Sequence, residues 1–407
     1  MYYRVDTAAV RHCGSEMIDI AKEMNAITDE ISDVSRCLRG MGSPSMFLLS
    51  IRINLQRQKI CRERSNAARM GALLEEIAGM YERAEAENAQ NCGKGEALNR
   101  TEPRNRDVSD LSDEEKDRII QEFITAHPEL DERLNGFLRT GDRYLKEEDI
   151  RNIKYLVYTA SAPFRDIYLN SLNDYSINKK RTKDGAYYTE GTCYYTYPDS
   201  FSTDPRGGYT TFFHENGHAI DHMSNVCDGS DGWDTSGFRI FSNEMNREVS
   251  LQDTIEYDVF YNAANPHSIY SIGTEKLRAG GASAGGNLDN VITAFKSGSS
   301  RGLSKEDRIL YNAIKNEFKR QTSVSSSARF EAVSDVYGGM SGNELRNGYG
   351  HDKSYWKNDP TNVVKELWAE YFSYNMAGDG ENLTYLREFF PESYGVLEQY
   401  AHTLAEK

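Results

Sequence analysis

The residues of this 407-residue chain that are best suited to chemistry are its histidines, three of which lie within the segment HENGHAIDH at positions 214–222. His214 and His218 are four residues apart, so on a helix they lie about 6 Å apart on one face and can bind the same metal ion. Glu215 would lie beside that ion, where it can take a proton from a water molecule. This H-E-x-x-H spacing predicts a catalytic metal site. The alternative is a pair of surface histidines on an ordinary helix.

A catalytic zinc site uses three protein ligands and keeps one position open. His222 cannot be the third ligand on a continuous helix, because it lies about 12 Å along the axis from His214. We expect His222 to be a surface or packing histidine and Asp221 to be a carboxylate on the face of the helix.

A better third ligand is found in the helical pattern NVVKELWAEYFSYNM at positions 362–376. Glu366 and Glu370 are four residues apart and share a helix face. We expect Glu366 to bind the metal and Glu370 to accept the second ring N–H of a ligating histidine. The alternative is an exposed glutamate pair on an amphipathic helix. We therefore expect one Zn²⁺ per chain, bound by His214, His218 and Glu366.

The first quarter of the chain differs from the rest, because only four of the 45 aromatic residues precede position 111. Apolar residues recur at three- and four-residue steps over 5–38 and again over 46–87, with the turn-forming segment LRGMGSPS between them. These patterns predict a long helical hairpin over residues 1–90. Residues 91–111 are polar and without periodicity, which is typical of a linker, and residues 112–407 then form one domain.

The second part of the chain is predicted to be mostly helical with a small β-sheet, which makes the fold class α+β. Ser112 and Glu115 form a capping-box pattern that opens a helix. The Tyr- and Thr-rich segment 185–201 indicates a β-hairpin. Further helices are predicted at 146–171, 304–320, 327–337, 361–377 and 382–405, whereas residues 224–303 are expected to be rich in loops.

The composition limits the partners that we expect. With 48 basic and 63 acidic side chains the formal net charge is −15, which argues against binding to nucleic acid or to an anionic membrane. No apolar run approaches the ~18–20 residues of a membrane-spanning helix, so we expect no membrane span. The first residues, MYYRVDTAAVRHC, lack the pattern of a signal peptide. We therefore expect either a cytoplasmic protein or secretion without a classical signal peptide.

Two of these segments together resemble a known family. HENGHAID followed by ELWAEYF is similar to the zinc peptidase domains of the anthrax lethal factor type, within the broader Glu-zincins. The resemblance covers about residues 180–380 and implies a zincin-like peptidase fold. It implies zinc bound by His214, His218 and Glu366, with Glu215 as general base in the hydrolysis of a peptide or protein substrate.

That family also uses a tyrosine ahead of the third ligand to support the oxyanion. In the lethal factor type the tyrosine lies seven residues before the ligand, and this sequence has Asp359 there. The segment GYGHDKSYW at 348–356 offers Tyr355 as our first candidate, His351 as the second and Tyr349 as a further one. A phenol or an imidazolium directed at the carbonyl oxygen stabilises the negative charge that develops on it.

The N-terminal segment has a resemblance of its own. Residues 1–90 are similar to the WXG/LXG-type helical hairpins of type VII-secreted proteins, with Leu38-Arg39-Gly40 at the turn and Tyr81-x-x-x-Glu85 in the second helix, although the tryptophan of the turn is absent. The resemblance implies type VII export and a helical-hairpin partner. Self-association through residues 1–90 is an equal alternative.

The function expected from these patterns is that of a zinc metalloendopeptidase, and the resemblances imply a bacterial secreted effector or toxin. The alternative from another class is a structural or interaction protein, either phage-head-associated or a partner in a secretion system, with a vestigial or structural zinc site. A metal-dependent hydrolase of a cell-wall peptide bond is a second enzymatic alternative.

Overall fold

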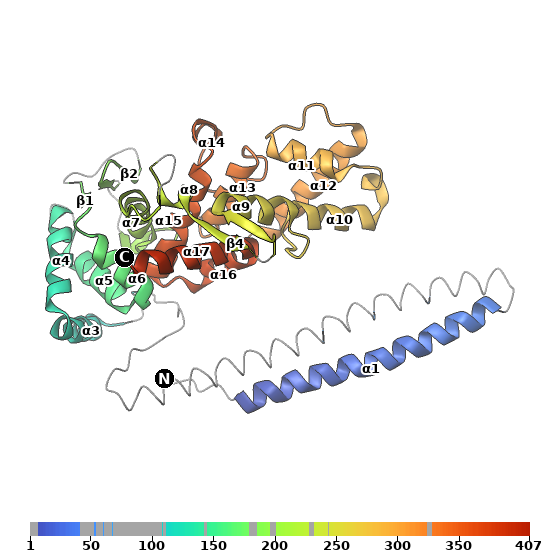
Figure 1. Cartoon of the computed structure of the whole chain (residues 1–407), viewed down its shortest axis with the longest axis horizontal. Helices are drawn as coiled ribbons and strands as arrows, with labels where there is room; N and C mark the ends of the chain where they lie inside the picture. The colour runs from blue at the N-terminus through green and yellow to red at the C-terminus, as the bar shows by residue number, and fades with distance from the viewer. Residues whose placement is uncertain are drawn as a thin grey trace. The chain divides into compact units, whose positions relative to one another are not determined.

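The computed structural model describes residues 7–40, 111–141, 145–178, 185–195, 201–227, 232–242, 244–323 and 328–407, together with a few isolated positions between 53 and 108. The chain divides into two compact units, Met1–Asn99 and Arg100–Lys407. Helices dominate the described residues of both units (Figure 1). None of the helices described is both long enough and apolar enough to cross a membrane.

The first unit contains one continuous described helix, α1 (Thr7–Gly40). Apart from isolated positions, the predicted second helix at 46–87 and the predicted linker at 91–111 lie outside the described residues. The buried face of α1 carries small side chains at seven-residue steps, namely Ala21, Thr28 and Ser35. Large apolar side chains at the same spacing are exposed, namely Ile20, Ile27 and Val34. The predicted amphipathic stripe is therefore only partly buried.

The second unit begins with α3 (Asp113–Ala126), α4 (Pro128–Leu138), the 3-10 turn η1 (Arg139–Gly141), α5 (Glu147–Thr159) and α6 (Ala162–Ser171). The predicted capping box is confirmed at the start of α3. The Ser112 hydroxyl accepts from the Glu115 N–H at 3.3 Å, and the Glu115 carboxylate accepts from the Ser112 N–H at 2.9 Å. Two of the donors that a helix start leaves unpaired are thereby satisfied.

Two small sheets follow. The first has the order β1-β3-β2 and is built from Ser176–Ile177, Tyr187–Thr189 and Thr192–Tyr194, with β2 and β3 antiparallel. Glu190 and Gly191 both have positive φ, at 45° and 77°, as a tight two-residue hairpin turn requires. The second sheet pairs β4 (Arg239–Ser242) with β5 (Arg247–Ser250). The predicted hairpin and the mostly helical α+β class are confirmed.

The expectation of loops over 224–303 is wrong. This region holds α8 (Asp234–Gly237), α9 (Leu251–Glu256), the π-helical turn η3 (Tyr257–Tyr261), α10 (Ile269–Ala279), the 3-10 turn η4 (Gly281–Ser283) and α11 (Leu288–Lys296). Short polar side chains cap these helices: Ser250 caps α9, Ser268 caps α10 and Asn287 caps α11. Helices this short show few periods in the sequence, and burial in the tertiary structure stabilises them.

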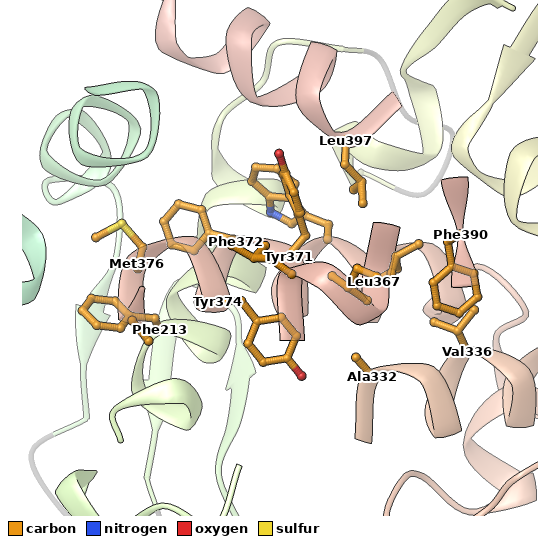
Figure 2. Close-up of a cluster of buried hydrophobic side chains, with 14 of the residues drawn as sticks. Phe213, Ala332, Val336, Leu367, Tyr371, Phe372, Tyr374, Met376, Phe390 and Leu397 are labelled. Atoms are coloured by element: carbon orange, nitrogen blue, oxygen red, sulfur yellow. The ribbon is translucent and has the colours of Figure 1, made fainter. Parts of the chain in front are cut away.

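The remaining elements are η2 (Phe201–Thr203), α7 (Thr210–Met223), α12 (Lys305–Gln321), α13 (Glu331–Met340), α14 (Lys353–Asn358), α15 (Asn362–Ala377), α16 (Gly380–Phe389) and α17 (Pro391–Ala405). Helix α15 is buried, and α7, α13, α14 and α16 pack against it. Figure 2 shows aromatic and aliphatic side chains of α15, among them Leu367 and Phe372, between Phe213 of α7 and Val336 of α13. Apolar side chains pack on several sides of α15, so the polar groups that it carries are held rigidly in the core.

Helix α7 packs closely on α15, and Gly217 makes this possible. A Cβ atom at Gly217 would lie 3.0 Å from the Cα atom of Ala369, tighter than ordinary packing allows. The Trp368 indole N–H donates to the Gly217 carbonyl at 3.0 Å. Glycine inside a helix costs about 1 kcal/mol against alanine, and the close approach of the two helices accounts for its presence here.

Candidate metal centre

Helices α7 and α15 bring three predicted ligands to one point. The Nε2 atoms of His214 and His218 are 3.1 Å apart, and Oε2 of Glu366 lies 3.1 Å from the first and 3.5 Å from the second. All three side chains are buried. Ligand atoms about 2.0–2.1 Å from a tetrahedral ion are about 3.3 Å from one another. The three observed separations fit that triangle, so the site has the geometry to hold a metal ion.

The chemistry of these donors also fits a metal ion. Glu366 Oε2 is buried and has no hydrogen-bond partner among the described residues. Burial alone would raise the pKa of Glu366, but the facing His218 and His351 hold it well below its usual range. Glu366 is therefore a carboxylate at neutral pH. Two imidazoles and one carboxylate form a donor set that divalent transition metals accept.

Glu370 lies one helical turn beyond Glu366 and connects the centre to an arginine. Its Oε1 atom is 3.4 Å from Nδ1 of His214 and 3.4 Å from Nη1 of Arg206. Burial alone would raise the pKa of Glu370, but Arg206 and His214 lower it to about 2. The structure therefore brings Glu370 to the ring nitrogen of His214 that faces away from the ligand triangle, which is where an orienting carboxylate belongs.

Glu215 lies beside this triangle and lines a cavity of about 660 Å³ together with His214. The side chain is buried. Burial raises the pKa of Glu215, and the neighbouring His214 and His218 partly offset this effect. A carboxylate with a raised pKa is a better general base at neutral pH, because its affinity for a proton is higher.

His351 reaches the same cavity from the loop before α14. Its backbone N–H donates to Oδ1 of Asp335 on α13 at 2.5 Å, and its Nδ1 lies 2.5 Å from Oδ2 of the same carboxylate. Its Nε2 lies 3.9 Å from Oε1 of Glu366. Asp335, His351 and Glu366 could form a second group of metal ligands. A 2.5 Å separation is too short for two ligands of one ion and fits a hydrogen bond, so this group is a carboxylate–imidazole pair.

Gly350 permits the contact between Asp335 and His351. Its φ is +136°, and a Cβ atom at this position would lie 2.2 Å from Oδ1 of Asp335. Burial alone would lower the pKa of His351, but Glu366 and Asp335 raise it to about 9. His351 is therefore an imidazolium near neutral pH and can donate from Nε2.

The two tyrosine candidates are placed differently. The Tyr355 hydroxyl donates to Oε1 of Glu366, and its ring stacks on His351 with ring centres 4.0 Å apart. Tyr349 is exposed and lines the cavity, as does His351, whereas Tyr355 is not among the cavity residues. Of the three oxyanion candidates, Tyr355 is the one that directly contacts a predicted metal ligand.

The last two residues of the segment HENGHAIDH have structural contacts. His222 is half-buried, stacks on Trp233 and lies 2.8 Å from the Tyr188 hydroxyl through Nδ1. Asp221 is buried and accepts from Thr235 and from the Tyr400 hydroxyl. Neither residue belongs to the ligand triangle, as expected, and Asp221 joins α7 to α8 and α17.

Sequence reasoning missed Arg206, Asp335 and Glu331 of this site. Arg206 contacts Glu331 and Glu370 through a single nitrogen, at 3.1 and 3.4 Å. None of the three belongs to a recognisable motif: Arg206 lies in the segment before α7, and Glu331 and Asp335 lie four residues apart on α13. The one signal available was the glycine before His351, because its positive φ leaves room for the Asp335 carboxylate.

Comparisons of this chain with models of known protein families, with curated proteins and with solved structures found no match. The geometry of the candidate metal centre and its cavity is therefore what indicates a function.

Proposed function

We propose that this protein is a zinc-dependent endopeptidase, with His214, His218 and Glu366 as the metal ligands. The observation that carries the proposal is the convergence of two imidazole nitrogens and one carboxylate oxygen at 3.1–3.5 Å, beside a cavity that His214 and Glu215 line. Zinc suits two nitrogens and one oxygen in a tetrahedral arrangement with an open fourth position. When bound, the ion would polarise a substrate carbonyl and lower the pKa of a water molecule.

Glu215 is the general base in this proposal. Its buried carboxylate takes a proton from the attacking water and passes it to the nitrogen of the leaving amine. Glu370 orients His214 from the far side of the ring, since its carboxylate lies 3.4 Å from Nδ1. We infer that the bond cleaved is a peptide bond, because His214, His218 and Glu366 together with Glu215 match the lethal factor type that the sequence resembles.

His351 is a better candidate than Tyr355 for oxyanion support. It lines the cavity, and Asp335 fixes which of its nitrogens carries a free N–H. An N–H directed at the carbonyl oxygen stabilises the negative charge formed there. Tyr355 would instead hold Glu366 through the hydrogen bond that it donates.

The substrate would bind as an extended chain. β2 is the outer strand of its sheet, with β3 on one side and no strand of the described residues on the other. Ala186, directly before β2, lines the cavity. An extended peptide can add to such an edge through backbone hydrogen bonds.

The first unit belongs to the proposal as an export or assembly module. The resemblance of residues 1–90 to type VII hairpins supports secretion as an effector or toxin, and the 34-residue helix α1 suits such a hairpin. Co-purification of full-length protein with a small helical partner from the source organism would test this part.

The enzymatic proposal is tested by cleavage of a peptide library and of peptidoglycan stem peptides, with zinc content measured in parallel. We expect about one zinc per chain. Glu215→Gln should retain the metal and lose about 10²–10⁴-fold in activity. Glu398→Gln, at an exposed position on α17, is the matched control and should behave as wild type. If the protein binds zinc but cleaves no peptide, a structural or interaction protein is favoured instead. If it cleaves stem peptides alone, a cell-wall hydrolase is favoured.

A further inference from the structure

The guanidinium of Arg206 has one edge that no other group uses. Its Nη1 atom contacts Glu331 and Glu370, whereas Nε and Nη2 are buried and have no hydrogen-bond partner among the described residues. Nε–H and Nη2–H lie side by side and form the fork that binds two acceptor oxygens at once. Buried donors without a partner are costly, and charged ones more so. A ligand that supplied acceptors here would remove that cost.

Arg206 is held firmly in the wall of the metal-site cavity. It is among the lining residues together with His214 and Glu215. Its backbone N–H donates to Asp204 at 2.9 Å, and its carbonyl accepts from Arg329 at 3.0 Å. Arg329 is held in turn by Asp379, 2.7 Å away. With its backbone fixed in this way and Nη1 held by Glu331 and Glu370, Arg206 keeps its free edge in a defined position.

The acidic neighbours of Arg206 leave its free edge unpaired. Glu331 is the closest counter-ion, 3.1 Å from Nη1, and Glu370 lies 3.4 Å both from Nη1 and from His214. Neither carboxylate satisfies Nε or Nη2. The matching partner for a free guanidinium fork is a carboxylate, whose two oxygens accept both N–H groups.

We propose that Arg206 is a specificity residue that binds a carboxylate of the substrate. This inference rests on the proposed peptidase function and adds the substrate class. The carboxylate belongs to an Asp or Glu side chain near the scissile bond, as in an endopeptidase, or to the C-terminus of the peptide, in which case the enzyme would cut near chain ends and not as an endopeptidase. His214 and Arg206 line one cavity and are joined through Glu370. The recognised group is therefore on a residue close to the bond that is cut.

Matched peptides separate the two sources of the carboxylate. Peptides cleaved by the wild-type protein are resynthesised with Glu or Gln at each position near the cleaved bond, and with a free or an amidated C-terminus. We expect the acidic member of one such pair to be preferred by about 10–100-fold in kcat/KM, mostly through KM. A preference at a side-chain position identifies the side chain, and a preference for the free C-terminus identifies the terminal carboxylate.

Variants of Arg206 decide whether this residue is responsible. Arg206→Lys keeps the positive charge and loses the fork, so the preference should shrink about tenfold, and Arg206→Met should abolish it. Zinc content and melting temperature show whether each variant keeps the site, and Arg301→Met at an exposed position is the control. If Arg206→Met unfolds, the size of the acidic preference in Arg206→Lys decides whether Arg206 is responsible.

Two results would overturn the inference. One is equal cleavage of all Glu/Gln and acid/amide pairs by the wild-type protein, since Arg206 would then bind no substrate carboxylate. The other is an acidic preference that survives in a folded, zinc-containing Arg206 variant. Both leave the proposed function standing. Failure of that function is seen separately, as the absence of Glu215-dependent cleavage of any peptide.

Discussion

Oε2 of Glu366 is the atom on which the metal centre depends most, because it closes the triangle begun by the two histidines. Glu366→Gln leaves a weak amide ligand in its place. We expect zinc affinity to fall by more than the 10–100-fold loss that is typical of an orienting residue such as Glu370. His222→Gln should leave the affinity unchanged. Competition with a zinc chelator measures both variants, and a larger loss in His222→Gln than in Glu366→Gln would refute the ligand assignment.

Asp335 is predicted to act through His351. Asp335→Asn removes the negative charge that helps to raise the pKa of His351 to about 9. His351 would then lose its proton at a lower pH. If the imidazolium is the active form, the alkaline limb of the kcat/KM profile should move to lower pH, while zinc content stays at the wild-type level. A profile that does not move would remove His351 from the mechanism.

Zinc binding should weaken as the pH falls. The carboxylate of Glu370 raises the pKa of His214 well above its usual range, although burial opposes this. Protons therefore compete with the metal for His214, and metal ligands must be deprotonated to bind. Chelator competition between pH 5 and 8 should show an affinity that rises with pH, whereas a flat profile would exclude histidine ligation.

At the residue scale, the sequence predicts some residues of the candidate site and gives no sign of others. His214, Glu215, His218 and Glu366 could be selected because their spacing on helices is itself the signal. Arg206 could not, since its segment carries no periodic pattern, and Asp335 could not, since nothing in the helix predicted over 327–337 distinguishes it from other carboxylates. Tertiary packing alone brings them there.

At the scale of elements, the site requires α7 to lie close to α15. Gly217→Ala would place a methyl group 3.0 Å from the backbone of Ala369. Overpacking of this kind costs about 1–3 kcal/mol, and the gain of about 1 kcal/mol in helix propensity offsets part of it. We expect a net loss in the free energy of unfolding together with weaker zinc binding.

Gly395→Ala is the matched control for this experiment. Gly395 lies inside α17, and a Cβ atom there would meet no described atom within 4 Å. The same change should therefore stabilise the protein by about 1 kcal/mol. Denaturant unfolding of both variants makes the comparison, and equal stabilisation by the two changes would mean that α7 and α15 are not in close contact.

Elements with strong local signals could be predicted, and elements without them could not. The capping box of Ser112 and Glu115 and the hairpin around Glu190 and Gly191 both formed as expected. The sequence predicts loops where the short helices between 234 and 296 form, because a helix such as α10, with 11 residues and Gly273 in its middle, shows only a few turns of the pattern. Burial of residues such as Ile269 and Ile272 stabilises it instead.

At the scale of the whole molecule, the metal centre lies within one compact unit. All ligands, the cavity and its lining belong to Arg100–Lys407. A chain that starts at Arg100 should bind zinc with the affinity of the full-length protein and melt at a similar temperature. Isothermal titration and thermal unfolding of both chains provide the test. A large loss of affinity on removing residues 1–99 would show that the first unit contributes to the site.

The three tryptophans allow zinc binding to be followed without labels. Trp233 packs against His218 with ring centres 6.0 Å apart, Trp356 packs against His351 at 5.4 Å, and Trp368 donates to Gly217. They are the only tryptophans in the chain. Zinc added to metal-free protein should therefore change the intrinsic fluorescence and saturate at one equivalent, in wild type but not in His214→Ala.

X-ray absorption at the zinc edge of the purified, zinc-containing protein tests the central claim most directly. If His214, His218 and Glu366 bind the ion, the first shell should contain only nitrogen and oxygen at about 2.0–2.1 Å, with the outer-shell scattering of two imidazoles. A first shell that contains sulfur at about 2.3 Å, or one without imidazole scattering, would contradict the account.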